Sequence, residues 1–259
     1  MRYIVDLQFF AAEDKTEKAT PKKREDVRKK GQTAKSQELV SASVFLVVFF
    51  TLSIATSSIL EGIIGVFYKT FQHYIFYDLT AGNLFRLAFG LVGDVMLILF
   101  PVFLAAFIAA ILANFLQVGV LFVTEPLKMK GERINPINGA KRIFSWRALV
   151  ELVKSLLKIT IIAAIVFVFL KSHFQELLDL IYIPPQGIVS VISELAVKMG
   201  LYSAIGLVAL GLLDYAYQKF DFERSIRMTK QEVKEEYKNI EGHPEIKSRI
   251  RQTQREFAR

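Results

Sequence analysis

The chain has 259 residues, of which 53% are hydrophobic and 22% charged, with a formal net charge of +8 and no cysteine. Apolar and charged residues fall into alternating blocks, which excludes an ordinary soluble domain and indicates a membrane protein with several spans. The lack of cysteine excludes a disulfide framework, thiol catalysis and thiolate metal sites. The three histidines are too far apart in sequence to favour a metal site or a catalytic triad.

Residues 1–38 begin with a short apolar stretch that continues into a dense charged run. Polar residues interrupt the apolar stretch and basic sequence follows it, so we reject a signal peptide. Thr20 fits an N-cap, Pro21 the first helical position and Gly31 a C-terminal cap, which predicts a short basic helix from Pro21 to Lys30. We expect this helix on the cytosolic face, close to anionic lipid.

Four apolar blocks follow, and each can supply one helix across a hydrocarbon core of about 30 Å. The predicted fold is therefore all-α, with four transmembrane helices. The second block extends to Val123, which is too long for one upright helix and too short for two with a turn. Two crossings would place the positively charged segment at 124–150 on the outside, so we assign this block a single crossing. The predicted spans are 39–60, 87–112, 150–172 and 188–213, and residues 113–149 form a loop.

The charge of the connecting segments predicts the orientation. Residues 13–38, 124–150 and 216–259 carry net charges of +3, +4 and +3, whereas residues 61–86 and 171–187 carry 0 and −1. Positive segments face the cytoplasm. We therefore expect both termini to be cytosolic.

Charged residues inside the predicted spans are costly, at about 2.5–3.5 kcal/mol each near the bilayer centre even on the lenient insertion scale. Asp94, Glu194 and Lys198 lie at similar depths from the outer ends of their spans. We expect an ion pair between Asp94 and Lys198 that joins spans two and four. The pair could fix helix packing, line a polar pathway or contact a partner's helices.

Lys154 and Lys158 share one face of span three with Glu151. A lysine near the end of a span can extend its side chain so that the ammonium reaches the membrane–water interface, and this explains how Lys154 is tolerated there. Only residues 159–170 of this span are uncharged. Spans three and four are therefore poor lone lipid helices, which points to burial in a larger assembly.

The loop at 113–149 combines turn dipeptides and basic residues with apolar ones. It can bind lipid headgroups or dock on protein, and composition alone leaves both open. The candidate contact residues are Asn135, Pro136, Asn138, Lys141, Arg142, Phe144 and Trp146. Glycine-rich phosphate loops are absent from the sequence, and topology explains its basic character, so we expect no nucleic-acid partner.

Residues 215–259 are mostly polar and predict a long, solvated helical linker. Thr229 and Glu232 fit a capping box that opens a helix, which Gly242 and Pro244 would end. Such a composition is too sparse in apolar residues to build a catalytic domain.

Three separated motifs resemble one known family. They are DKTEKATPKKR at 14–24 with RKKGQ at 28–32 and AKS at 34–36; NPING at 135–139 with KRIFS at 141–145; and the segment from Asp214-Tyr215 to MTKQEVKEE at 228–236. Together they look like the FlhB/SctU export-switch proteins of type III secretion. The start DLQFFA at 6–11 is more similar to flagellar than to injectisome members.

The resemblance implies a subunit of an export gate in the bacterial inner membrane, at the flagellar basal body. The implied partners are the gate subunits FliP, FliQ and FliR, and FlhA. In the family, the loop between spans two and three wraps the cytosolic entrance of the gate. The resemblance also implies that the four spans form two hairpins, which pack on gate helices. Export-substrate switching would involve rod and hook proteins and the hook-length control protein, through a C-terminal domain.

One family feature is absent from this sequence. Family members cleave themselves in an Asn-Pro-Thr-His motif of that C-terminal domain, and this chain has no such motif. We expect the chain to stop short of the domain, to be unable to cut itself, and to act without chemistry, cofactor or metal.

The rival hypothesis is a small secondary transporter that uses Asp94, Glu194 and Lys198 in the membrane. Transporters commonly have repeated halves, and the two halves of this chain match only loosely.

Overall fold

The computed structural model describes residues 15–76, 80–123, 146–241 and 253–258. The chain divides into two compact units. The membrane unit contains Lys35–Val120 and Met129–Tyr217, and the terminal unit contains Met1–Ala34, Leu121–Lys128 and Gln218–Arg259. Within the described residues the regular elements are helices, together with one isolated bridge between Glu17 and Met228.

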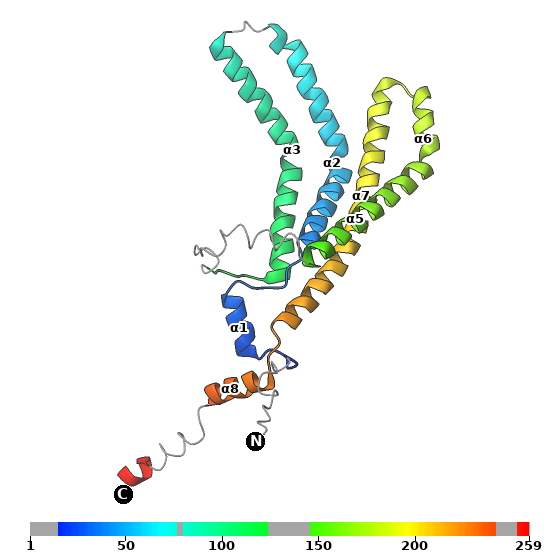
Figure 1. Ribbon diagram of the computed structural model, residues 1–259. Helices are drawn as coiled ribbons and strands as arrows, with labels where there is room; N and C mark the ends of the chain where they lie inside the picture. Colours follow the sequence, from blue (N-terminus) through cyan, green and yellow to red (C-terminus); the bar gives the residue numbers. More distant parts are fainter. Residues whose placement is uncertain (1–14, 77–79, 124–145, 242–252, 259) are drawn as a thin grey trace. The chain divides into compact units, whose positions relative to one another are not determined.

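Four helices are long and apolar enough to cross a membrane, which confirms the predicted fold class. They are α2 (Gln37–Gln72), α3 (Ala81–Val118), α5 (Trp146–Ser172) and α7 (Pro185–Ser225). In Figure 1, α2 and α3 form one hairpin, and α5 and α7 form another. The short helix η2 (Tyr74–Phe76) lies at the turn of the first hairpin, and α6 (Phe174–Asp179) with η5 (Leu180–Tyr182) at that of the second.

The helices are longer than the apolar windows that predicted them. The 36 residues of α2 extend for about 54 Å, well beyond a hydrocarbon core of about 30 Å. Helix α3 continues through residues 113–118, which we predicted as loop, and ends at Gly119 with a φ of 71°. Hydropathy detects only the apolar part of a helix, because the backbone hydrogen bonds continue through its polar end turns.

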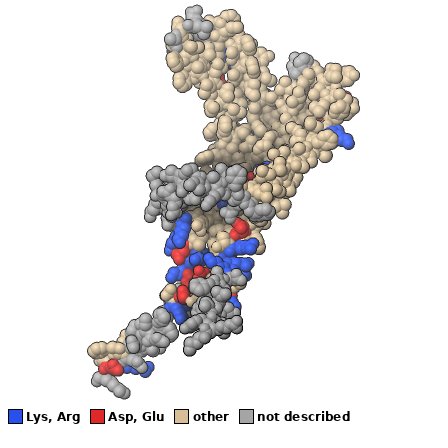
Figure 2. Space-filling view, viewed as in Figure 1, with Lys and Arg blue, Asp and Glu red and all other residues tan. Residues whose placement is uncertain are grey.

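The surface of the membrane unit is largely apolar. Large side chains of α2 and α3 such as Phe50, Phe89 and Phe107 are exposed, and Figure 2 shows this part of the molecule with almost no charge. Hydroxyl groups within α2 bond to the helix's own carbonyls, as Thr51 does to Val47 at 2.8 Å. An apolar exterior with internally satisfied polar groups is what a lipid or protein-covered environment requires.

Small residues of α7 allow α2 to approach closely. A Cβ added at Gly211 would lie 2.8 Å from Cα of Leu39, and one at Gly200 would lie 1.9 Å from the ring of Phe49. Ala204, on the same stretch of α7, is fully buried. This spacing of small residues is the usual means of close helix packing in membranes.

The terminal unit contains α1 (Pro21–Lys29) and α8 (Lys230–Glu241), and both predicted helix starts are confirmed. The Thr20 side chain accepts a hydrogen bond from the amide of Lys23. Thr229 and Glu232 form the reciprocal capping box, with both bonds at 3.1 Å. The predicted linker is divided, however, because α7 ends at Ser225 and α8 begins only at Lys230.

Candidate functional site

A group of polar side chains lies where the four long helices of the membrane unit come together. We call it the junction cluster, and its members come from the start of α2, the end of α3, the first half of α5 and the end of the membrane part of α7. They are Ser36, Glu38, Gln117, Lys154, Lys158 and Asp214.

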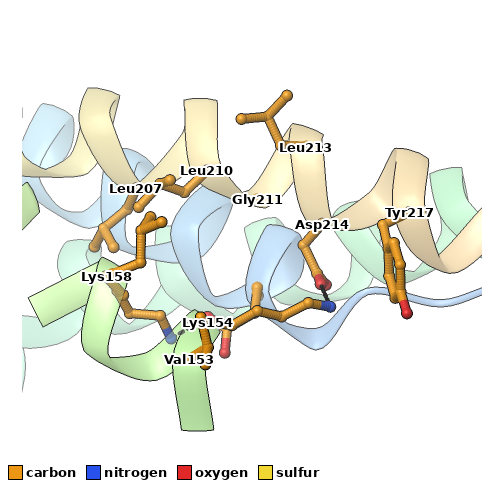
Figure 3. A pocket seen from close by; sticks show the side chains of 11 residues that line it. Val153, Lys154, Lys158, Leu207, Leu210, Gly211, Leu213, Asp214 and Tyr217 are labelled. Carbon is orange, nitrogen blue, oxygen red and sulfur yellow. Dashed lines mark hydrogen bonds and ion pairs between the residues drawn. The ribbon is translucent and has the colours of Figure 1, made fainter. Parts of the chain in front are cut away.

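Asp214 is the centre of the junction cluster. Its carboxylate accepts hydrogen bonds from the hydroxyl of Ser36 and the ammonium of Lys154, each at 2.6 Å. The Asp214 side chain is only 10% exposed. The Lys154 ammonium also lies 4.2 Å from the centre of the Tyr217 ring, which is cation–π geometry. Figure 3 shows Asp214 and Lys154 turned toward each other from neighbouring helices.

Ser36 links the other two helices to this carboxylate. It caps α2 by accepting a hydrogen bond from the amide of Leu39, and it is fully buried. Its backbone amide donates to the Gln117 side chain at 2.9 Å, which joins the start of α2 to the end of α3. The Nε2 atom of Gln117 is buried without a partner among the described residues.

A second ion pair, between Lys158 and Glu38, joins α5 to α2. The two pairs lie beside a cavity of about 280 Å³ with mostly apolar walls. The apolar residues of its wall are Val153, Leu157, Leu207, Leu210 and Leu213. The charged groups are thus paired with one another at the edge of an apolar space, where an ion pair is stronger than in water.

This arrangement supports helix connection and offers little for catalysis. The Ser36 hydroxyl is buried and already bonded to Asp214, so it is not available to a substrate. Within the described ranges, no group of three or more His, Cys, Asp or Glu side chains could hold a metal ion. The cluster instead connects the four long helices through hydrogen bonds and ion pairs.

The predicted ion pair between Asp94 and Lys198 is not formed. Asp94 pairs with Lys69 of α2, with the two atoms 2.5 Å apart, and Lys198 pairs with Glu194 on its own helix at 2.7 Å. Lys69 belongs to α2, the adjacent helix of the same hairpin, and its long side chain extends to Asp94 of α3. Depth alone could not distinguish these two partners.

The pairs formed by Asp94 and Glu194 are far from the junction cluster along their helices. Twenty residues separate Glu194 from Asp214 on α7, and twenty-three separate Asp94 from Gln117 on α3. At 1.5 Å per residue these separations are about 30 and 35 Å, close to one hydrocarbon thickness. Asp94 and Glu194 therefore lie near one level of the helices, and the junction cluster, which includes the predicted intramembrane residue Lys158, lies near another.

Most of the predicted gate-loop residues lie outside the part of the chain that the structure describes. Asn135, Pro136, Asn138, Lys141, Arg142 and Phe144 lie outside the described residues. Trp146 is the first residue of α5, and its side chain also lies outside the description. A docking role for these residues stays a prediction.

Of the junction cluster, the sequence analysis considered only the two lysines as charges within a span, and Lys158 was a predicted intramembrane residue. Ser36 and Asp214 entered only as residues of the family motifs. Asp214 was missed because it directly follows an apolar run and reads as the end of a span. Two lysines on one face of a span nonetheless require acidic partners, and the acids flanking spans one and four were the available candidates.

Four helices that are long and apolar enough to cross a membrane, joined at one end by two ion pairs, define a polytopic helical membrane protein. Within that class, the chain belongs to the FlhB HrpN YscU SpaS family, whose sequence profile matches residues 13–259. This confirms the resemblance found in the three motifs.

Individual relatives match all or nearly all of the chain. The flagellar biosynthetic protein FlhB of Bacillus subtilis is 46% identical over 259 residues, which are 100% of this chain and 71% of that protein. FlhB of Aquifex aeolicus is 37% identical over 96% of this chain and 71% of its own length. The Yop proteins translocation protein U of Yersinia pestis is 34% identical over 94% of this chain and 68% of its own length. The family's and relatives' names describe biosynthesis and translocation proteins, and the secondary-transporter hypothesis is not supported.

Proposed function

We propose that this protein is a membrane subunit of the flagellar type III protein-export apparatus, where it takes part in flagellum assembly and in switching between export substrates. The observation that carries the proposal is the full-length match to flagellar biosynthetic protein FlhB, at 46% identity. The lower identity to the Yop translocation protein favours a flagellar over an injectisome member.

The protein would lie in the bacterial inner membrane at the flagellar basal body, with both termini in the cytosol. The positive net charges of residues 13–38, 124–150 and 216–259 support this orientation. In it, the junction cluster lies at the cytosolic boundary of the hydrocarbon. Asp94 and Glu194, about one hydrocarbon thickness away, then lie near the outer boundary instead of the costly centre.

The partners we propose are the gate subunits FliP, FliQ and FliR, and FlhA. Their helices would cover the exposed apolar faces of α2, α3, α5 and α7. Exported rod and hook proteins and the hook-length control protein would act through the C-terminal domain of the family. The partner set rests on the family resemblance, and the exposed apolar surface is the physical reason that partners are needed.

The action we propose is mechanical, with no chemistry carried out by this chain. The segment between α3 and α5 would rest on the cytosolic entrance of the gate. Gln117 stands two residues before Gly119, where that segment begins, and Lys154 lies on the third turn of α5, just after it ends. The junction cluster would thus hold both ends of the gate loop and connect them to α7.

Deletion of residues 135–145 in a strain lacking its native copy tests this function. We expect flagellar secretion and motility to be lost while the protein still inserts in the membrane in normal amount. Co-purification of the unaltered protein should recover the gate subunits in fixed ratio. Normal motility with the deletion would contradict the role of the loop, and purification of the protein alone would contradict the assembly.

A further inference from the structure

A short joint separates the membrane-spanning helix α7 from α8 within the terminal unit. Helix α7 ends at Ser225 and α8 begins at Lys230. The joint residues would be exposed on a free linker, but Ile226 is only 5% and Met228 only 4% exposed. Something must therefore cover the joint, and the N-terminal segment does so.

The backbone of the N-terminal segment pairs with the joint itself. The amide of Glu17 donates to the carbonyl of Met228 and the amide of Met228 donates to the carbonyl of Glu17, both at 3.0 Å. This is a hydrogen-bonded antiparallel pair between residues more than 200 positions apart in sequence. The pairing fixes the backbone of the joint in an extended conformation between the two helices.

Side chains of the N-terminal segment hold the helices on either side of the joint. Arg24 makes two parallel hydrogen bonds, at 2.6 and 2.7 Å, to the carboxylate of Glu223 in the last turn of α7. The hydroxyl of Thr20 donates to Glu236 of α8 at 2.5 Å. The hydrogen bonds that Arg24 donates to Glu223 raise the pKa of its guanidinium above its ordinary value.

An apolar core completes the contact. Ala19 and Val27 of the N-terminal segment pack with Ile226 of the joint, and Phe222 of α7 lies against them. The predicted basic helix at 21–30 therefore has one apolar contact face. Val27 lies in this core, and most of the charged side chains of the helix are exposed. Lipid attraction explains the charges but not the buried contacts.

We propose that residues 15–30 act as a clamp that fixes the angle between α7 and α8. One contact lies before the joint, one on it and one after it, so the clamp determines the direction in which α8 leaves the membrane-spanning helix. Release of the clamp would let α8 reorient without any change in the membrane unit. This role is independent of the proposed function, because it can be tested without any secretion assay.

A disulfide can test the pairing directly, because the chain has no cysteine of its own. Residues in a hydrogen-bonded antiparallel pair have Cα atoms about 5.5 Å apart, which a disulfide can bridge. In the full chain in lipid nanodiscs, Glu17→Cys with Met228→Cys should form an intramolecular disulfide on mild oxidation. The control pair, Glu17→Cys with Glu235→Cys on exposed α8 surface, should give little or none. Equal cross-linking of the two pairs would overturn the clamp.

A charge exchange tests the clamp without changing its core. Arg24→Glu should increase the rate of trypsin cleavage after Arg227 by up to about fivefold, the range of a partly exposed ion pair. Addition of Glu223→Arg should restore most of the protection. Lys29→Glu is the matched control, since Lys29 pairs with Glu25 on its own helix. The clamp is wrong if the Arg24 and Lys29 variants are cleaved alike, or if the exchange restores nothing.

Discussion

The ammonium of Lys154 lies 2.6 Å from the carboxylate of Asp214, and this contact joins α5 to α7 at the junction cluster. The Asp214 side chain is 10% exposed and also holds Ser36, the N-cap of α2. A single carboxylate therefore connects three of the four long helices. Its removal should affect the whole membrane unit.

Asp214→Ala should lower the stability of the protein by about 2–4 kcal/mol, because it leaves a charged ammonium and a buried hydroxyl without their acceptor. This loss of stability is smaller than for a fully buried ion pair, because the Lys154 side chain keeps some contact with water. Asp214→Asn is the control that keeps an acceptor for Ser36, and it should cost less. Thermal unfolding in nanodiscs measures both, and equal stabilities of the alanine variant and the unaltered protein would contradict the central place of Asp214.

Gly211→Ala should destabilise the packing of α2 on α7. The new Cβ would lie 2.8 Å from Cα of Leu39, and backbone cannot move aside as a flexible side chain can. The expected loss is about 1–3 kcal/mol, as for other overpacked sites. Gly65→Ala is the matched control, since nothing lies within 4 Å of its added Cβ. It should be neutral or stabilising by up to about 1 kcal/mol, because alanine favours helix over glycine.

Two charge exchanges distinguish the partner of Asp94. Asp94→Lys alone should weaken the first hairpin, and its combination with Lys69→Asp should recover about 0.5 kcal/mol or more of stability, as contacting pairs do. The combination of Asp94→Lys with Lys198→Asp should recover nothing, because Lys198 pairs with Glu194. Unfolding measurements on these three variants and the unaltered protein show which lysine is the partner of Asp94. If stability recovered only in the combination with Lys198→Asp, the result would support the ion pair between Asp94 and Lys198 that the sequence predicted.

Thr229→Ala should loosen the start of α8. The hydroxyl of Thr229 accepts the amide of Glu232 and completes the capping box, and loss of such a cap costs about 1 kcal/mol. Hydrogen exchange of the α8 amides should become faster while that of α2 and α7 is unchanged. Lys234→Ala, at an exposed position of the same helix, is the control. Unchanged exchange in α8 would show that the cap does not hold the helix start.

Local signals in the sequence were enough to locate the helices and the starts of two of them. Runs of apolar residues located all four spanning helices, and Thr20 with Pro21 and Thr229 with Glu232 located the starts of α1 and α8. These features act over a few neighbouring residues, so one sequence contains them in full. The predicted span ended six residues before the end of α3. It was ended at residue 112 to satisfy the topology, whereas the first residue that ends the helix is Gly119.

Contacts between distant residues were predicted poorly. The sequence analysis found Lys158 but gave it no partner, missed Asp214, and paired Asp94 with the wrong lysine. The pairing depends on helix register and on close approach, such as that of Leu39 to Gly211, which no single segment encodes. The clamp between residues 15–30 and the α7–α8 joint was missed for the same reason, since its two sides lie at opposite ends of the chain.

Flagellar secretion by charge-exchange variants of the junction cluster is the most direct test of the account. In a strain lacking the native copy, Lys154→Asp and Asp214→Lys should each abolish secretion, because each leaves two like charges facing each other within the junction cluster. The double exchange should restore part of the secretion, with all variants compared at equal amounts in the membrane. Normal secretion by the two single variants would contradict the claim that this ion pair connects the helices that hold the gate loop.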